Sequence, residues 1–154
     1  MFWDLLVKPL LSELKLKNIV EVGAQTGINT NKILQYCREQ EGKLHTIDPA
    51  PIFDYMKLKE ENEENFEFYK ELSLSALPLL KDYDAILLDG DHNWYTVYHE
   101  LNCINDSFKG KEKFPLILLH DIGWPYGRRD LYYNPENIPD VDRNSTRLNY
   151  SHSI

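Results

Sequence analysis

A short apolar run that ends in an acid and a glycine most constrains what this chain can fold into. The run is I-V-E-V-G, residues 19–23, and a second glycine, Gly27, follows the intervening A-Q-T. A second run, L-H-T-I, closes on Asp48. A strand, a tight turn, a helix and a strand ending in an acid are typical of a parallel sheet that holds a nucleotide-type cofactor. Glycines let the backbone approach the ligand, and the acid accepts hydrogen bonds from two ribose hydroxyls.

The same alternation of apolar runs and amphipathic stretches continues along the chain. Because strands that alternate with helices build a parallel α/β sheet, the sequence predicts that fold class with about five strands. A leading helix is expected over residues 3–15, and Asn29 or Thr30 is expected to cap the helix after the glycine turn. The helix that follows the fourth strand is expected to bury Val97, Leu101 and Ile104. The expected strands are Asn18–Val22, Lys43–Ile47, Phe66–Tyr69, Ala85–Leu88 and Leu116–Leu119.

Length and charge narrow the classes of partner. A chain of 154 residues forms at most one domain with a real core. Its formal net charge of -8 disfavours nucleic acid and anionic lipid as partners and leaves small neutral or cationic molecules open. No stretch reaches the length of a membrane span, and Cys37 and Cys103 are expected to be reduced core residues. These features predict a cytoplasmic protein that binds a small-molecule substrate, and they leave open whether it forms a homo-oligomer.

The unusual polar residues gather where the predicted strands end. Glu21 and Gly23 close the first strand, Asp48 follows the second, and the segment D-G-D-H, residues 89–92, follows the fourth. His120 and Asp121 follow the fifth. Parallel sheets bind ligands at the carboxyl ends of their strands, so these coinciding positions predict one ligand site.

Four segments together resemble the class I S-adenosylmethionine-dependent methyltransferases. They are E-V-G-A-Q-T-G-I-N-T, T-I-D-P, Y-D-A-I-L-L-D-G-D-H-N-W-Y and L-I-L-L-H-D-I-G-W-P. Within that class the chain is most similar to the small-molecule branch of sugar and macrolide O-methyltransferases and cephalosporin-hydroxylase-like proteins. The resemblance implies a Rossmann-like sheet with strand order 3-2-1-4-5 and helices on both faces.

The resemblance also implies which residues bind S-adenosylmethionine. Glu21, Gly23 and Gly27 would line the methionine end of the cofactor, with Ala24 beside them. Asp48 would bind the ribose diol. Ser73, at the start of the helix after the third strand, would lie on the adenine side or cap that helix.

The remaining strand-end residues would carry the chemistry. In related metal-dependent members an acid after the fourth strand and an acidic pair after the fifth surround a divalent cation, and the matching residues here are Asp89, His120 and Asp121. Magnesium is the candidate metal, although a histidine in place of a carboxylate weakens that case. Asp91 and His92 are the candidate general bases. The expected reaction is in-line transfer of the sulfonium methyl group to a hydroxyl of a small molecule, a sugar among the candidates.

Two other functions stay open at this point. One is an NAD-dependent oxidoreductase, which the glycine spacing E-x-G-x-x-x-G disfavours because dinucleotide sites use G-x-G-x-x-G. The other is a non-catalytic cofactor-binding or interaction domain of a longer, glycosyltransferase-associated protein.

The end of the chain differs in character from the rest. Residues 122–140, rich in Gly, Pro, Tyr and Asn, predict a long functional loop whose aromatic and arginine side chains are candidates for a substrate wall. Residues 143–154 resemble translated sequencing-adapter sequence, so we expect a disordered, non-native tail. We therefore expect residues 1–142 to form a methyltransferase domain that lacks the family's C-terminal strands.

Overall fold

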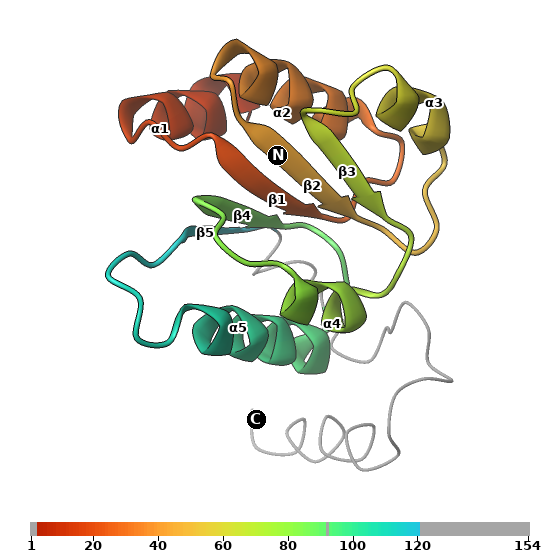
Figure 1. Ribbon diagram of the computed structural model, residues 1–154. Helices are drawn as coiled ribbons and strands as arrows, with labels where there is room; N and C mark the ends of the chain where they lie inside the picture. Colours follow the sequence, from red (N-terminus) through yellow and green to blue (C-terminus); the bar gives the residue numbers. More distant parts are fainter. Residues whose placement is uncertain (1–2, 92, 121–154) are drawn as a thin grey trace, which may run out of the picture.

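The sheet has five parallel strands, in the order β3-β2-β1-β4-β5. The computed structural model describes residues 3–91 and 93–120 of the chain. The parallel α/β class predicted from the alternating pattern and the strand order implied by the family resemblance are both confirmed (Figure 1). The strands are β1 (Asn18–Val22), β2 (Lys43–Ile47), β3 (Phe66–Tyr69), β4 (Ala85–Leu88) and β5 (Leu116–Leu119).

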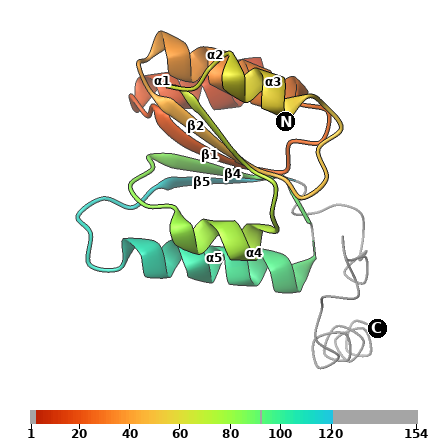
Figure 2. The same ribbon diagram turned by 45° about the vertical axis from the view of Figure 1, so that its right-hand side comes forward.

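Helices cover both faces of this sheet. On one face lie η1 (Trp3–Val7), α1 (Lys8–Glu13), α2 (Ile28–Glu39) and α3 (Tyr55–Glu60). On the other lie α4 (Ser73–Ala76), η2 (Leu77–Leu79) and α5 (Trp94–Phe108). Figures 1 and 2 show the resulting three layers, with α1, α2 and α3 on one side and α4 and α5 on the other.

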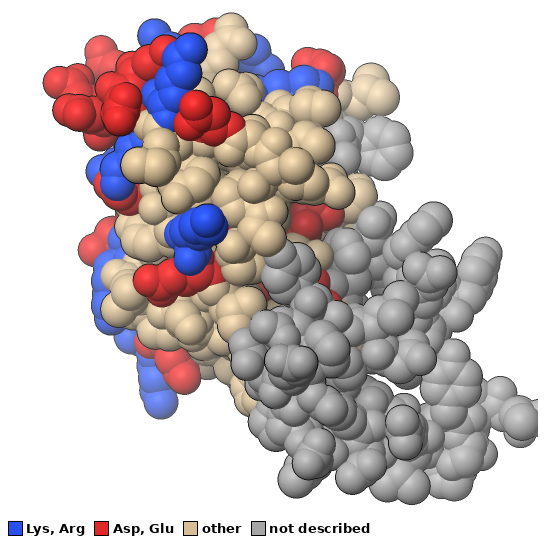
Figure 3. All heavy atoms as spheres, turned by 90° about the vertical axis from the view of Figure 1, so that its right-hand side faces the viewer, with Lys and Arg blue, Asp and Glu red and all other residues tan. Residues whose placement is uncertain are grey.

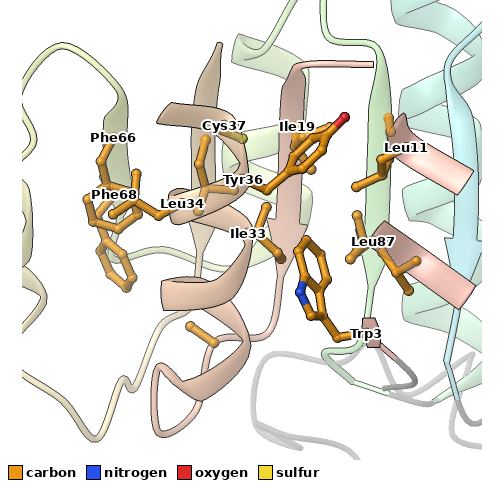
Figure 4. Close-up of a cluster of buried hydrophobic side chains, with 14 residues drawn as sticks. Trp3, Leu11, Ile19, Ile33, Leu34, Tyr36, Cys37, Phe66, Phe68 and Leu87 are labelled. Carbon is orange, nitrogen blue, oxygen red and sulfur yellow. The ribbon is translucent and has the colours of Figure 1, made fainter. Parts of the chain in front are cut away.

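Each strand contributes side chains to two separate cores because successive residues of a strand point to opposite faces. Ile19 of β1 packs under α2 in one core, and Val20 packs toward α5 in the other. In the first core the Trp3 ring meets the Tyr36 ring edge to face, with centroids 6.2 Å apart (Figure 4). Strands buried on both faces are apolar at most positions, which is why β4 shows no polar alternation. The buried Glu21 of β1 and Thr46 of β2 are exceptions.

The leading helix follows the expected residues but changes geometry along its length. Residues 3–7 form a π-helical turn, and α1 continues to Glu13. Pro9 lies in the first turn of α1, directly after the π-helical turn.

Two details of the helices differ from the sequence-based expectation. The N-cap of α2 is Gly27, with φ +76°, so the predicted cap at Asn29 or Thr30 is wrong. Both residues lie inside the helix and donate hydrogen bonds to Glu21 instead. In α5 the fully buried residues are Thr96, Glu100, Ile104 and Phe108, whereas Val97 and Leu101 are only half-buried. Two of the four residues on that buried face are therefore polar.

The strands point toward the side of the molecule that Figure 3 turns to the viewer. Where the described residues are visible on this face, most of the surface belongs to side chains that are neither acidic nor basic, and charged side chains gather toward its upper left. Within residues 3–91 and 93–120, no helix combines the length and the apolar character needed to cross a membrane.

Candidate functional site

Gly23 brings the loops after β1 and β4 into direct contact. Its φ is +90°, a conformation that costs glycine little and other residues much. A Cβ atom at this position would lie 2.2 Å from the carbonyl oxygen of Asp89. The Gly23 N–H also donates to the carbonyl of Ile47 at 2.9 Å. The carboxyl ends of β1, β2 and β4 therefore meet at one residue that has no side chain.

The segment after β2 closes over the start of α2. The Phe53 ring packs so closely on Gly27 that a Cβ atom there would lie 2.8 Å from the ring. The backbone N–H of Ile52 donates to the carbonyl of Gln25 at 2.7 Å. Ile28, at the first position of α2, and Ile52 are both strongly exposed, so this end of the site has an apolar rim.

Asp48 joins the two segments through backbone hydrogen bonds. Its Oδ2 accepts from the N–H groups of Ala24 and Gln25, each at 2.8 Å. Its Oδ1 accepts from the N–H of Ala50 at 2.7 Å, and the residue is 6% exposed. An oxygen that accepts one hydrogen bond keeps a second lone pair, so Oδ1 can still accept from a ligand hydroxyl.

Glu21 lies behind the glycine loop, on the face of the sheet that α2 covers. It has no exposed surface, and its carboxyl group accepts hydrogen bonds from Thr30 (2.7 Å), Thr46 (3.1 Å) and Asn29 (3.1 Å). Burial raises the pKa of Glu21 to about 7, although the three hydrogen bonds oppose the shift. The side chain thus fixes α2 against β1 and β2, and its predicted contact with a cofactor stays a prediction.

Ser73 starts α4, on the opposite side of the glycine loop. The N-cap of that helix is Leu72, so Ser73 does not have the capping position. The Ser73 side chain is buried and lies close to Glu100 of α5. Ala24, also buried, belongs to the core beneath α2.

The ends of β4 and β5 are joined by an acid and a histidine. Nδ1 of His120 lies 2.9 Å from Oδ1 of Asp89, and both side chains are about one quarter exposed, at 28% and 26%. Asp121, the third residue of the predicted metal set, lies outside the described residues. Among residues 3–91 and 93–120, no three His, Cys, Asp or Glu side chains are grouped so that they could hold a metal ion.

Asp91 organises the start of α5. Its Oδ1 accepts from the N–H of Asn93 at 3.1 Å and its Oδ2 from the Thr96 hydroxyl at 2.9 Å. Asn93 then caps the helix by accepting from the N–H of Tyr95 at 2.8 Å. His92, the other predicted base, and the predicted substrate wall beyond residue 121 both lie outside the described residues.

Glu100 is a residue that the sequence analysis did not select. It is 2% exposed on the inner face of α5, next to Ser73 and Asp91. The only sequence signal is an acid four residues after Thr96, on the face where an apolar stripe is expected. That signal is weak because a single acid in a helix is usually solvated.

The carboxyl edge of the sheet therefore combines the glycine turn at Gly23 with the carboxyl group of Asp48, which backbone hydrogen bonds hold in place. Polar side chains follow the neighbouring strands, at Ser73 after β3 and at Asp89 after β4. The turn allows a ligand to approach the backbone, and the lone pair left on Asp48 can bind a hydroxyl group. These features fit a cofactor that consists of an amino acid joined to a nucleoside. For a hard cation the fit is poor, because the described donors are one carboxylate and one imidazole already in contact with each other.

Comparison with known proteins gives two findings. The sequence model of a family described as "Methyltransferase domain" matches residues 20–122. The solved structure of the S-adenosylhomocysteine-bound methyltransferase PaMTH1 of Podospora anserina is similar in fold, with a TM-score of 0.60 and 17% sequence identity. The similarity covers 92% of this chain and 61% of that one, so the chain spans less than two thirds of that protein. The comparison with curated proteins finds no match.

Proposed function

Because this chain belongs to the methyltransferase-domain family, we propose that it transfers the methyl group of S-adenosylmethionine to a hydroxyl of a small molecule. The junction of Gly23, Asp48 and Asp89 is the observation that carries the proposal. It brings the loops after three strands together at the edge where parallel sheets bind ligands. The relative PaMTH1, solved with S-adenosylhomocysteine, has the same fold.

The cofactor would lie across the glycine loop. The backbone from Gly23 to Gly27 would approach its methionine end, and Oδ1 of Asp48 would accept from a ribose hydroxyl. Ser73 would lie on the adenine side, one strand further along the sheet. Glu21 would support this arrangement from behind, because its hydrogen bonds join the start of α2, at Asn29 and Thr30, to Thr46 of β2.

The protein would accelerate the reaction mainly by positioning. The bound cofactor supplies an electrophilic methyl group on a sulfonium, and the site has to hold the acceptor oxygen in line with it. A base then removes the hydroxyl proton. Both carboxylate oxygens of Asp91 already accept hydrogen bonds, from Asn93 and Thr96. We therefore propose His92, the next residue in the chain, as the base, and Asp91 as the residue that holds the loop in place.

A small hydroxylated acceptor fits the charge of the chain. A formal net charge of -8 repels the phosphates of nucleic acids, and it does not repel a neutral sugar. The apolar rim at Ile28 and Ile52 would suit an acceptor with one apolar face. Sugars and small aglycones are therefore the first acceptors to test.

The first experiment is a thermal melt of the purified chain with S-adenosylhomocysteine, and with NAD as the comparison ligand. A ligand at one hundred times its dissociation constant should stabilise the folded state by about 2.7 kcal/mol. We expect stabilisation by S-adenosylhomocysteine and none by NAD. Stabilisation by NAD alone would favour the oxidoreductase, and a cooperative melt that responds to neither ligand would contradict the proposal.

A second experiment separates binding from catalysis. The chain is incubated with methyl-labelled S-adenosylmethionine and a panel of hydroxylated sugars and aglycones, and label transfer is measured. Label in an acceptor with wild-type protein, and none with the His92→Ala variant, is the expected result. Cofactor binding without transfer to any acceptor would favour the non-catalytic domain instead.

A further inference from the structure

The strand β5 has the composition of a buried strand but lies at the end of the sheet. Its residues, L-I-L-L, are as apolar as the A-I-L-L of β4. All side chains of β4 are buried, whereas those of β5 are at most half-buried and Leu119 is 40% exposed. Because β5 is last in the strand order, no neighbouring strand lies on its outer side within the described residues. An apolar edge strand of this kind is a site of pairing with a further strand.

The backbone of β5 also presents hydrogen-bonding groups on its outer side. The N–H groups of Leu116 and His120 donate to carbonyl groups within residues 84–88, each at 3.0 Å. Successive N–H groups of a strand point in opposite directions in the plane of the sheet, so those of Ile117 and Leu119 point away from β4. These two groups are the donors that a further strand would use.

The opposite edge of the sheet is protected in a way that β5 is not. In β3 two buried phenylalanines alternate with partly exposed residues, and Glu67 forms an ion pair with Lys59 of α3. The Tyr55 ring of α3 also stacks on the Phe68 ring, with centroids 4.3 Å apart. Charged side chains and a covering helix are common protections of an edge strand. The residues of β5 include no charge.

The helical segment η1–α1, next to β5, has two apolar stripes. One is buried in the core against which Leu116 and Leu118 of β5 also pack, and it consists of Trp3, Val7 and Leu11. The other has the same four-residue spacing and consists of Leu6, Leu10 and Leu14. Leu6 and Leu14 are 55% and 50% exposed. A helix that packs only on its own sheet needs one apolar stripe, so the second stripe indicates a second contact.

The exposed stripe lies on the side of α1 that faces away from α2. Lys8 marks the α2 side, because its Nζ lies 3.8 Å from a carboxylate oxygen of Glu39. At about 100° per residue, the stripe that contains Leu10 and Leu14 falls on the other side of the core stripe from Lys8. Figure 1 shows α2 between α1 and α3, so α1 is the outermost helix on this face. The exposed stripe is therefore on the β5 side of the molecule.

Phe114 extends the apolar surface on the α5 side of β5. It is 56% exposed, and its ring centroid lies 5.9 Å from that of Phe108 in α5. Apolar side chains thus follow one edge of the molecule through all three layers. We call this surface the β5 edge, and it consists of Leu6, Leu10, Leu14, Phe114 and residues 116–119. A pair of short strands alone is small beside the about 800 Å² that each partner of a stable interface buries, and the flanking side chains supply further area.

We propose that the β5 edge is the interface between two copies of this chain, with their β5 strands paired antiparallel about a two-fold axis. The two sheets then form one continuous sheet, and the exposed stripes of the two α1 helices face each other. A two-fold axis brings the same surface of both copies together, and a strand paired with its own copy in this way is antiparallel.

The charges at the two ends of β5 favour this pairing. The segment before the strand, K-G-K-E-K-F (residues 109–114), carries a net positive charge. Asp121 follows the strand, and Asp89 follows the neighbouring β4. Antiparallel pairing brings the basic end of one copy to the acidic end of the other, whereas parallel pairing would place like charges together.

The segment that follows β5 in the same chain is a weaker candidate for the pairing strand. Residues 122–140 are predicted to form a loop, and they are interrupted by Pro125, Pro135 and Pro139. Proline has no N–H to donate and is rare inside paired strands. A second copy supplies an apolar strand of matching length.

The first test is the molar mass of the purified chain, measured by light scattering and sedimentation equilibrium across protein concentrations. We expect twice the 18.2 kDa of one chain at high concentration. Leu6→Lys and Leu14→Lys each place a charge in the interface at an exposed position, so the fold should be kept. The dissociation constant of the dimer should rise at least about tenfold in each variant. Met56→Lys, at a 61% exposed position on α3 beside the opposite edge, is the control and should dimerise like wild type.

Amide hydrogen exchange, followed by NMR, tests the strand pairing itself. The N–H groups of Ile117 and Leu119 should be protected in the wild-type dimer and should exchange rapidly in the Leu14→Lys monomer. The N–H of Leu116, which donates to Asp84 within one chain, should be protected in both and serves as the reference. Neither measurement requires a cofactor, so the interface is tested independently of the proposed function.

Four results would overturn the interface. A wild-type chain that stays monomeric at every concentration has no such contact. A dimer in which Ile117 and Leu119 exchange rapidly uses another surface. Protection of these two groups in the Leu14→Lys monomer would show that the same chain covers β5. Leu6→Lys and Leu14→Lys variants that both dimerise as tightly as wild type would exclude α1 from the contact.

Discussion

Asp48 and Asp84 hold the two ends of β1 with the same hydrogen-bond pattern. Oδ2 of Asp84 accepts from the consecutive N–H groups of Lys17 and Asn18, just before and at the start of the strand. Oδ2 of Asp48 accepts from the consecutive N–H groups of Ala24 and Gln25, just after its end. Only Asp48 lies at the carboxyl edge of the sheet. Variants of the two residues can therefore separate effects on the stability of β1 from effects on the candidate site.

Replacing Asp48 by alanine should weaken both the fold and the cofactor site. Three backbone N–H groups lose a charged acceptor, which should cost about 3 kcal/mol in the free energy of unfolding. The glycine loop then loses its anchor, so S-adenosylhomocysteine should bind at least about tenfold more weakly, a loss of about 1.4 kcal/mol. Urea denaturation and calorimetric titration measure the two effects.

Asp84→Ala is the matched control for that variant. It removes two hydrogen bonds of the same kind at the far end of the strand, and it should cost about 2 kcal/mol of stability. Its affinity for S-adenosylhomocysteine should stay within about twofold of wild type, a difference of about 0.4 kcal/mol. Equal affinity losses in both variants would show that Asp48 acts on binding only through general stability.

Gly23→Ala should be among the most destabilising small substitutions in the described part of the chain. The added Cβ would lie 2.2 Å from the Asp89 carbonyl oxygen, and the backbone cannot relax without separating the loops after β1 and β4. The steric clash adds to the cost of a positive φ, so we expect a loss of more than about 3 kcal/mol. The measurement is the midpoint of urea denaturation.

Gly110→Ala separates the two contributions. Gly110 also has a positive φ, +80°, but nothing lies within 4 Å of the position of its Cβ. This variant should lose only about 1 kcal/mol, the cost of the backbone conformation. Similar losses at the two glycines would contradict the close contact at Gly23.

The buried Glu21 predicts a specific dependence of stability on pH. Burial raises its pKa from 4.5 to about 7 in the folded protein, so the folded state binds the proton more tightly than the unfolded state does. The stability that this group contributes is complete below pH 4.5, and it is lost as the pH rises to about 7. Glu100, with its pKa also raised to about 7, adds an effect of the same sign.

Glu21→Gln should remove the Glu21 part of this slope. We expect the difference in unfolding free energy between wild type and variant to fall as the pH rises from 4.5 to 7 and to stay constant above that range. Denaturant titrations at half-unit pH steps measure this difference. A difference that does not change between these two pH values would show that the Glu21 carboxyl group titrates normally.

The strands were predictable because burial on both faces leaves a strong local signal. All five strands have the bounds expected from the apolar runs, and their ends brought Gly23, Asp48 and Asp89 to one edge as predicted. The cap of α2 was not predictable in the same way. Asn29 and Thr30 are residue types that often cap helices by accepting from backbone N–H groups, but here both lie inside α2 and donate to the buried Glu21, while Gly27 provides the turn.

By itself the sequence determined the fold class, the strand bounds and the edge of the sheet at which the candidate residues gather. These follow from periodicity and from residue types at strand ends, which are local properties of the chain. Only the tertiary structure decided which polar atoms meet. The hydrogen bonds of Asp48 to the glycine loop and of Thr30 and Thr46 to Glu21 join residues from different segments. From the sequence alone, a buried carboxyl group such as Glu100 cannot be told from a solvated one. Packing removes the water around it, and this desolvation raises its pKa.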